Sequence, residues 1–420
     1  MSALVQPISL APKSAKNQDV TFDREAVEAR YAFKDVPNTF EQNSFRRLLQ
    51  HCLDIGVSDI YLKTGDPVKV RVGKPIFKLT KRSLETSELN TIVTEVYGTN
   101  GPSKLGGGEA IDYAYELKLE GQRGVSVRFR MNATGCLSPS GPGVEIVMRP
   151  LQENPPEIST MKLPPDLMEQ LFPEIGLVLV TGETGSGKTT LLAAIIRYIL
   201  EQPESNKRIL TGEDPIEFVF DKCKRYSSMV AQHEIGRHLK SFSEFIRNAV
   251  RRDPNILMVG EMRDHETINA GIQAAQVGKA VYSTLHTNSV GQTWKRMVNV
   301  FPHEERVSKM VDLIDTTKVI LTQRLVASTE KNDDGNFKRI ALREFLVFDD
   351  EVKTRLIEQV GADVNMLPFL THSIVKERKQ LLVDEARRYY REGMISEIEY
   401  KKYEVSASQA ERMLGSDGPQ

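Results

Sequence analysis

Residues 182–189 read GETGSGKT, and residues 256–264 read ILMVGEMRD. The first stretch is a complete G-x-x-x-x-G-K-[S/T] motif, preceded by the apolar run 177–180 and followed by a helix-like run over 191–200. This strand–loop–helix context is the one in which the motif binds phosphate. The second stretch has the apolar run of a strand buried on both faces of a parallel sheet, and an acidic residue, Glu261, follows it. Together the two stretches predict a P-loop NTPase of the α/β class.

The residue types of the phosphate loop explain how it would hold a nucleotide. Gly182, Gly185 and Gly187 lack a Cβ, so the backbone can take positive φ and bring its N–H groups against phosphates. The helix that starts near Lys188 points the positive end of its dipole at the same anion. Lys188 is expected to reach the β- and γ-phosphates, and the Thr189 hydroxyl to ligate Mg²⁺. The predicted cofactor-binding residues are Gly182, Glu183, Thr184, Gly185, Ser186, Gly187, Lys188, Thr189 and Thr190.

Composition excludes several other classes of protein. The 420 residues suffice for two or three domains, and 56 basic against 57 acidic residues give no basic field that would indicate a nucleic-acid partner. Cys52, Cys136 and Cys223 lie far apart, so neither a zinc cluster nor a disulfide framework is predicted. No apolar stretch approaches the ~20 residues that span a bilayer, and the amino terminus lacks the pattern of a secretory signal. We therefore expect a cytoplasmic protein that reaches a membrane only through partners.

The chain before the phosphate loop divides into three parts. Residues 1–38 are polar and lack periodicity, which predicts a disordered tail. Residues 39–150 are expected to form an α+β domain, because a helix-like run over 82–96 lies among short strand-like runs. The expected strands cover residues 60–62, 68–72 and 124–132. The proline-rich segment 151–165 predicts a linker.

From residue 166 to 330 strand-like and helix-like runs alternate, which predicts a parallel sheet with helical crossovers. Besides the strands that flank the two motifs, strands are expected over residues 208–211 and 280–285. A helix over 264–277 is expected to close at Gly278, a suitable left-handed carboxyl-terminal residue. Residues 331–420 are rich in charge, and we expect them to be mainly helical.

Four segments resemble, in order and spacing, the Walker A, Asp box, Walker B and His box of the ATPases that drive type II secretion, type IV pili and type IV secretion. They are LVTGETGSGKTTLLAAI, ILTGEDPIEFV, RNAVRRDPNILMVGEMRDHETI and VYSTLHTNS. In the first domain, SDIYLKTGDPVKVRVGK and VSVRFRMNATG resemble the PAS-like amino-terminal domain of this family. The segment ALREFLVFDDEVK and the helical end after it are most similar to the DotB and TraJ branch of type IVB secretion and conjugal-transfer ATPases.

The resemblance implies roles for acids outside the phosphate loop. Glu217 matches the Asp-box glutamate that activates the attacking water, and Glu213 and Asp214 match the acids upstream of it. Glu261 matches the Walker B glutamate that holds Mg²⁺ through water. A carboxylate at a metal is less basic than one further away, but which of the two glutamates is the base stays open. His286 matches the second His-box histidine, which contacts the γ-phosphate.

Two further positions concern charge around the nucleotide. Many retraction ATPases carry a histidine where this chain has Lys279, which would either supply a fixed positive charge there or be a solvated surface residue. Arg130 and Arg149 of the first domain match family arginines that reach the nucleotide. Such an arginine contributes ~10³-fold or more to phosphoryl transfer in other NTPases. Their alternative interpretation is ordinary surface charge on an edge strand.

For the whole chain, the resemblance implies a PAS-like amino-terminal domain, a RecA-like P-loop domain and a helical carboxyl-terminal extension. It implies a homohexameric motor that hydrolyses ATP to ADP and phosphate with Mg²⁺, docked on a type IVB secretion or conjugative machine at the inner face of the inner membrane. No direct nucleic-acid contact is expected. Three alternatives stay open. A type IV pilus extension or retraction ATPase shares every box. A helicase is disfavoured by the balanced charge, and a non-catalytic docking protein by the complete set of site residues.

Overall fold

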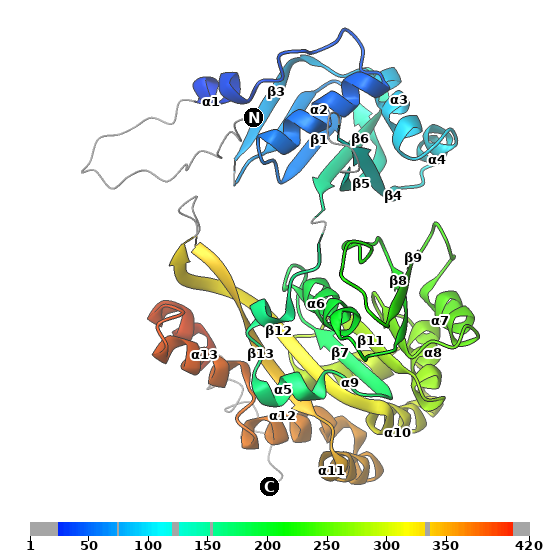
Figure 1. Ribbon diagram of the computed structural model, residues 1–420, viewed down its shortest axis with the longest axis vertical. Helices are drawn as coiled ribbons and strands as arrows, with labels where there is room; N and C mark the ends of the chain where they lie inside the picture. Colours follow the sequence, from blue (N-terminus) through cyan, green and yellow to red (C-terminus); the bar gives the residue numbers. More distant parts are fainter. Residues whose placement is uncertain (1–23, 74, 120–125, 152–153, 332–336, 406–420) are drawn as a thin grey trace. The chain divides into compact units, whose positions relative to one another are not determined.

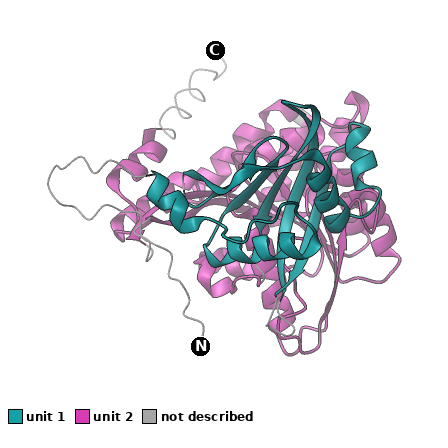
Figure 2. Cartoon of the chain, turned by 90° about the horizontal axis from the view of Figure 1, so that it is seen from above, with its two compact units in different colours: residues 1–153 teal, residues 154–420 magenta. Residues whose placement is uncertain are grey.

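A computed structural model describes residues 24–73, 75–119, 126–151, 154–331 and 337–405 of the chain (Figure 1). The chain divides into two compact units, residues 1–153 and 154–420, which Figure 2 shows in different colours. Each unit has its own hydrophobic core. None of the helices in the described part is both long and apolar enough to cross a membrane.

The first unit is an antiparallel sheet of six strands with helices packed against it. The strand order is β3-β2-β1-β6-β5-β4, and each neighbouring pair is antiparallel. The strands are β1 (Asp59–Lys63), β2 (Pro67–Arg71), β3 (Ile76–Ser83), β4 (Ile111–Lys118), β5 (Ser126–Ser138) and β6 (Gly141–Pro150). The helices are α1 (Arg24–Tyr31), α2 (Gln42–Asp54), α3 (Thr86–Val96) and α4 (Gly101–Gly106). The core lies between the sheet and the helices α2 and α3. Each of these helices turns an apolar face toward the sheet and a more polar face away from it.

The amino-terminal segment differs from the predicted disordered tail wherever it is described. Residues 1–23 lie outside the described residues, but α1 is helical, and Tyr31 and Phe33 are buried in the core of the first unit. The Tyr31 ring lies 5.7 Å from that of Phe77, and its carbonyl contacts His51 Nε2 at 2.8 Å. Because residues 1–38 are polar on average, the sequence did not indicate that these two aromatic side chains attach the segment to the core. The helix predicted over 82–96 begins only at residue 86, because the residues before it complete β3.

The second unit is built on a seven-stranded sheet of order β13-β12-β7-β11-β10-β8-β9. All neighbours are parallel except β12 and β13, which are antiparallel. The strands are β7 (Gly176–Thr181), β8 (Arg208–Glu213), β9 (Met229–Glu234), β10 (Ile256–Val259), β11 (Ala280–Leu285), β12 (Thr317–Lys331) and β13 (Phe337–Val347). The sheet thus continues past residue 330, where the sequence led us to expect a mainly helical region, and its β13 edge is not parallel. β9 was not predicted either.

Helices cover both faces of this sheet. The α-helices are α5 (Pro165–Gln170), α6 (Lys188–Glu201), α7 (Phe242–Val250), α8 (His265–Gln276), α9 (Val290–Val298), α10 (Arg306–Thr316), α11 (Asp350–Ala362), α12 (Leu367–Glu377) and α13 (Leu382–Arg391). Short 3₁₀ turns are η1 (Ile158–Met161), η2 (His303–Glu305) and η3 (Val364–Met366). Every residue of β7, β10 and β11 is buried, so none of these strands alternates between apolar and exposed polar residues. The Ser283 and Thr284 hydroxyls of β11 donate to backbone carbonyls.

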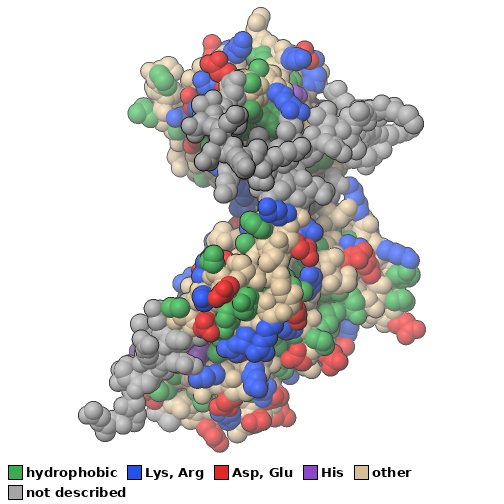
Figure 3. Space-filling view, turned by 90° about the vertical axis from the view of Figure 1, so that its left-hand side faces the viewer, with side chains coloured by type: hydrophobic (Ala, Val, Ile, Leu, Met, Phe, Trp, Pro, Cys, Tyr) green, Lys and Arg blue, Asp and Glu red, His purple; other side chains and the backbone are tan. Residues whose placement is uncertain are grey.

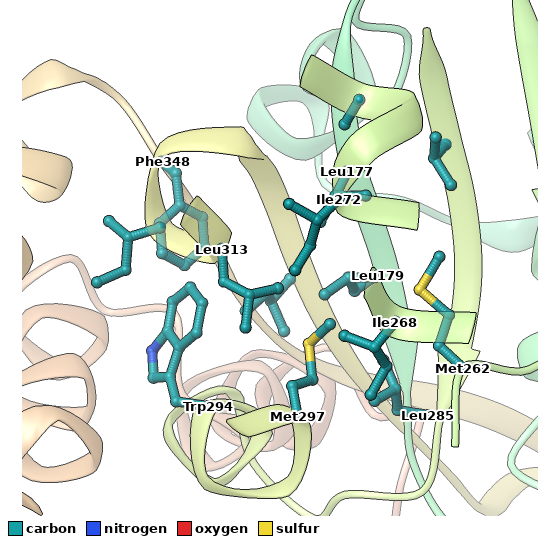
Figure 4. Close-up of a cluster of buried hydrophobic side chains, with 14 of the residues drawn as sticks. Leu177, Leu179, Met262, Ile268, Ile272, Leu285, Trp294, Met297, Leu313 and Phe348 are labelled. Carbon is teal, nitrogen blue, oxygen red and sulfur yellow. The ribbon is translucent and has the colours of Figure 1, made fainter. Parts of the chain in front are cut away.

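Alternate side chains of β7 enter two different cores. Leu177 and Leu179 join the larger core beneath α7 to α12, around the fully buried Trp294 (Figure 4). Val178 and Val180 face the opposite side, where α5 and α6 pack. The Trp294 indole N–H donates to Thr371 Oγ1 of α12 at 3.0 Å, so this large ring is buried without leaving its polar atom unpaired. The two cores hold the strand ends, and therefore the loops that follow them, in place.

The predicted linker also differs from the structure. Residues 152–153 lie outside the described part, but Ile158, Met161 and Leu163 pack against the core beneath α6. Arg197 of α6 donates to the Pro155 carbonyl at 2.7 Å. The prolines therefore mark a segment that contains the short turn η1 and is packed on the second unit, rather than a free spacer.

Candidate nucleotide-binding site

The phosphate loop connects the end of β7 to the start of α6, as the motif requires. Gly182, Gly185 and Gly187 have φ of 143°, 79° and 86°, the region that side-chain-bearing residues rarely adopt. A Cβ on Gly182 would lie 2.3 Å from the Gln323 carbonyl oxygen, so this glycine is also required by close approach of the backbone. Ser186 Oγ is buried and has no hydrogen-bond partner among the described residues. The loop thus has a polar atom, Ser186 Oγ, available to a ligand.

Lys188, the first residue of α6, lies across the loop. Its side chain is buried (8% exposed), and Nζ donates to the carbonyls of Gly182 at 2.8 Å and Glu183 at 2.9 Å. Burial lowers the pKa of Lys188, while the carboxylates of Glu261 and Glu217 act on it in the opposite direction. The charges of both acids therefore act on this ammonium group, although Glu217 belongs to the segment after β8 and Glu261 to the segment after β10.

Glu261 and His286 follow neighbouring parallel strands, β10 and β11, and so they meet at the carboxyl edge of the sheet. Glu261 Oε1 lies 3.9 Å from His286 Nε2, and Glu261 Oε2 lies 3.8 Å from Arg263. The pKa of His286 is lowered by burial and by the positive charges of Lys188 and Arg296, against the effect of Glu261. His286 is thus favoured as a neutral imidazole, which can donate one hydrogen bond and accept another.

The acids upstream of Glu217 are placed differently from one another. Glu213 ends β8, is buried, and accepts hydrogen bonds from Thr211 Oγ1 at 2.6 Å and Gln232 Nε2 at 3.0 Å. Asp214 is exposed. Because the Glu213 carboxylate is engaged within the sheet, its contacts are those of a structural residue, whereas Glu217 is half-buried beside Lys188.

The residues that would hold Mg²⁺ fit that ion chemically. Thr189 is the second residue of α6 and half-buried, and Glu261 is half-buried at the end of the Walker B segment. A hydroxyl and a carboxylate are oxygen ligands of the kind that Mg²⁺ takes together with water and nucleotide phosphates. No group of three or more His, Cys, Asp or Glu that would form an all-protein metal cage occurs in the described ranges. The remaining predicted loop residues, Thr184 and Thr190, lie in the exposed tip and in the first turn of α6.

Lys279 does not lie near this site, so of its two interpretations the fixed positive charge at the γ-phosphate is not supported. It directly precedes β11, whereas His286 directly follows that strand. Six strand residues at ~3.3 Å each place the two about 20 Å apart, at opposite edges of the sheet. Lys279 Nζ instead pairs with Asp253 Oδ1 at 3.3 Å. The strand predicted over residues 280–285 is the reason for this separation, because it carries Lys279 and His286 at its two ends.

Arg130 and Arg149 lie on the first unit, and the other candidate residues lie on the second. They are register partners on the adjacent strands β5 and β6, so their side chains leave the same face of the sheet. Arg130 is exposed. Arg149 donates through Nε and Nη2 to Asp59 Oδ1, at 2.9 and 2.6 Å, although 66% of its side chain stays exposed. Two arginines therefore lie side by side on one face of this sheet. One of them, Arg149, is oriented by its ion pair with the buried carboxylate of Asp59.

Sequence reasoning missed residues on β12 that touch the phosphate loop. Gln323 Nε2 donates to the Ser186 carbonyl at 2.7 Å, and Arg324 lies 3.7 Å from the Glu183 carboxylate. β12 is the direct neighbour of β7 in the sheet, which brings its residues beside the loop. The signal available in the sequence was the polar stretch Thr322-Gln323-Arg324, which interrupts the apolar run 319–326 at the carboxyl edge where ligand sites form.

Comparison with known proteins identifies relatives over most of the chain. A family model described as type II/IV secretion system protein matches residues 111–408. The type IV pilus retraction ATPase PilT of Pseudomonas aeruginosa is 34% identical over 315 residues, which cover 74% of this chain and 84% of that protein. The X-ray structure of the Legionella pneumophila ATPase DotB covers 89% of this chain and 98% of its own, at 40% identity and a TM-score of 0.80. A crystal structure of the pilus retraction motor PilT with bound ADP covers 85% and 96%, at 30% identity and a TM-score of 0.71.

Proposed function

The chain belongs to the type II/IV secretion system protein family and is an ATPase of that family, and from this membership we propose that it is a hexameric motor of a type IVB secretion or conjugative machine. Its likeness to DotB supports that branch, because both the sequence identity and the TM-score exceed those of the PilT structure. The motor would dock on inner-membrane or cytoplasmic components of the machine. Hydrolysis of ATP would move the two units, joined near residues 152–153, relative to each other.

The observation that carries the enzymatic part is the geometry of the phosphate loop, in which the Lys188 side chain is buried and Ser186 Oγ has no partner among the described residues. The Lys188 ammonium, now held by two loop carbonyls, is the group that would transfer its hydrogen bonds to the β- and γ-phosphates. Phosphoryl transfer depends mainly on positioning and on neutralising charge, so a buried cation at this place contributes directly. Removing this single positive charge is therefore the sharpest test.

The acids and the histidine divide the remaining tasks. We propose that Glu217 orients the attacking water and accepts its proton, because it lies near the site without being placed at the expected metal position. Thr189 and Glu261 would hold Mg²⁺, which supplies charge neutralisation on the phosphates when bound. His286, favoured as the neutral form, would donate a hydrogen bond to a γ-phosphate oxygen. Arg130 and Arg149 would add positive charge from the first unit of the same or a neighbouring subunit.

A type IV pilus retraction motor is the second candidate function. It is favoured by the 34% identity to PilT over most of both proteins. Both candidates predict the same ATPase site and differ only in the machine that receives the motor. A translocase that tracks nucleic acid receives less support, since Lys and Arg side chains are interspersed with Asp and Glu on the face shown in Figure 3.

Steady-state phosphate release by the purified full chain tests the enzyme, and Lys188→Ala is the decisive variant. We expect that variant to lose ATP binding and turnover. Lys279→Ala is the matched control, because it removes the same charge at the opposite edge of the sheet and should hydrolyse at the parental rate. Equal rates for the parent and Lys188→Ala would refute the assignment of the site.

The choice between the two machines needs the host cell. A chromosomal Lys188→Ala substitution should abolish protein secretion or conjugal DNA transfer and leave twitching motility intact. Loss of twitching with normal secretion and transfer would instead assign the chain to a pilus.

A further inference from the structure

A buried polar chain lies directly behind the phosphate loop and belongs to none of the motifs. Its two central members are Gln323 on β12 and Arg343 on β13, which are register partners across the antiparallel edge pair of the sheet. Only 3% of Gln323 and 2% of Arg343 is exposed. A buried amide and a buried guanidinium are costly unless their hydrogen bonds are made, so their contacts show what they hold in place.

Gln323 holds the loop at two points. Its side-chain amide donates to the Ser186 carbonyl at 2.7 Å, and its main-chain carbonyl is the atom against which Gly182 packs. Its side-chain carbonyl accepts from Arg343 Nε at 3.0 Å. The NH₂ group and the oxygen of the amide each have a partner, so the NH₂ group is the end that faces the loop.

The hydrogen bond to Ser186 has a consequence for phosphate binding. In a planar trans peptide the C=O of one residue and the N–H of the next point in opposite directions. Fixing the Ser186 carbonyl toward Gln323 therefore aims the Gly187 N–H away from it, and backbone N–H groups are what such a loop offers to phosphate. Gly187, at φ 86°, has the conformational freedom that would let this peptide rotate. The side chain of Gln323 thus restrains a peptide that glycine alone leaves mobile.

Arg343 connects this restraint to the carboxyl-terminal region. Its Nη2 donates to the Met161 carbonyl at 2.8 Å, and its backbone N–H donates to the Glu385 carboxylate of α13. Glu385 is itself buried and pairs with Arg388 at 3.0 Å on the next turn of the same helix. Helix α13 packs on β13, as Figure 1 shows. A continuous set of polar contacts therefore runs from α13 through Arg343 and Gln323 to Ser186.

We propose that Gln323 and Arg343 are positioning residues of the ATPase site, and that the packing of α13 on β13 through Glu385 sets the affinity of the phosphate loop for nucleotide. The inference rests on the proposed nucleotide site and adds its regulation. A partner of the motor that shifts α13 would then change nucleotide affinity without touching the loop. The effect travels through a defined set of hydrogen bonds, each of which can be removed singly.

The direct test is Gln323→Glu, assayed by calorimetric titration of the full chain with ADP. The glutamate has the size of glutamine and can still accept from Arg343, but as a carboxylate it cannot donate to the Ser186 carbonyl. Leaving a buried hydrogen-bonding group unpaired costs about 1–3 kcal/mol, which corresponds to roughly 5- to 150-fold weaker ADP binding. Gln273→Glu, on the exposed side of α8, introduces the same charge elsewhere and should bind ADP like the parent.

Thermal unfolding without nucleotide separates positioning from a merely structural role. If Gln323→Glu unfolds at a lower temperature but keeps the parental ADP affinity, Gln323 only supports the fold and the proposal is overturned. If the variant fails to fold, Glu385→Gln decides, with exposed Glu358→Gln on α11 as its control. We expect Glu385→Gln to weaken ADP binding by roughly 3- to 10-fold through Arg343. Parental affinity in that variant would remove α13 from the proposal.

The same titrations keep this proposal distinct from the site assignment itself. A parent protein that binds neither ADP nor ATP would refute the proposed ATPase function. A parent that binds ADP and loses it in Lys188→Ala, together with unchanged affinity in Gln323→Glu and Glu385→Gln, would leave the ATPase function standing and overturn the positioning role alone.

Discussion

Glu344 should make the second unit less stable as the pH rises from 5 to 8. This carboxyl lies on β13, is 5% exposed, and accepts from the Val290 N–H at 2.8 Å at the start of α9. Burial is the largest influence on it and raises its pKa to about 7 from the ordinary 4.5, while the N–H groups of Val290 and Leu382 and the charge of Arg324 oppose that rise. The folded protein therefore favours the protonated carboxyl, and the unfolded chain ionises it earlier.

The sign and size of the pH effect on the free energy of unfolding follow from the difference between the folded and unfolded pKa values of Glu344. A carboxyl whose pKa is raised by folding contributes its full stability below about pH 4.5 and loses it as the pH rises through about 7. For pKa values of 4.5 and about 7, the linkage relation gives a loss of about 2.5 kcal/mol in the free energy of unfolding between pH 5 and pH 8. Glu344→Gln cannot ionise, so its stability should lack this component.

The assay is urea unfolding of the parent and of Glu344→Gln at several pH values, followed by tryptophan fluorescence. The chain has one tryptophan, Trp294, which is fully buried in the core of the second unit and so reports on that unit. The stability difference between the two proteins should change by about 2.5 kcal/mol over this range. Exposed Glu358→Gln is the matched control. A difference that stays constant within about 0.5 kcal/mol would show that burial does not perturb Glu344.

Three further predictions concern the site. Gly182→Ala should abolish nucleotide binding in an equilibrium titration, because its Cβ would meet the Gln323 carbonyl oxygen at 2.3 Å and the residue has φ 143°; wild-type affinity would contradict the loop geometry. Glu261→Gln should still bind ATP yet lose nearly all phosphate release, and substantial turnover would exclude Glu261 from the metal site. Arg130→Ala and Arg149→Ala should bind ATP, assemble normally in size-exclusion chromatography and hydrolyse at least ~10³-fold more slowly. Parental specific activity that stays flat on dilution would make both arginines ordinary surface charges.

The sequence predicted the parts of the site that are local in the chain. The phosphate loop, the Walker B strand and the strand before His286 each depend on a short stretch whose residue types determine its structure. The family resemblance is confirmed by the match over residues 111–408. The roles given to Glu217, Glu261, His286 and the two arginines remain predictions, since their test is catalytic.

What the sequence did not predict depends on contacts between distant segments. Gln323 is 137 residues from the carbonyl that it binds, and no spacing along the chain indicates that β12 lies beside β7. The two interpretations of Lys279 stayed open in the sequence, and the structure separates it from the site because β11 carries Lys279 and His286 at its opposite ends. Residues 24–38 and 154–165 were taken for a tail and a linker, because averaged polarity and proline content conceal a few anchors such as the buried Tyr31 and the half-buried Met161.

The order of strands explains why regulation and catalysis meet in this fold. The phosphate loop, His286 and Glu261 follow β7, β11 and β10, three adjacent strands, so the reacting groups occupy one side of the loop. The other side of β7 is occupied by β12 and then β13, which bear Gln323 and Arg343. Because β13 is the sheet edge and α13 packs against it, the carboxyl-terminal helices lie two strands from the loop. A change in nucleotide occupancy and a change in the seating of α13 are therefore coupled through the same buried side chains, and by linkage each must influence the other to the same extent.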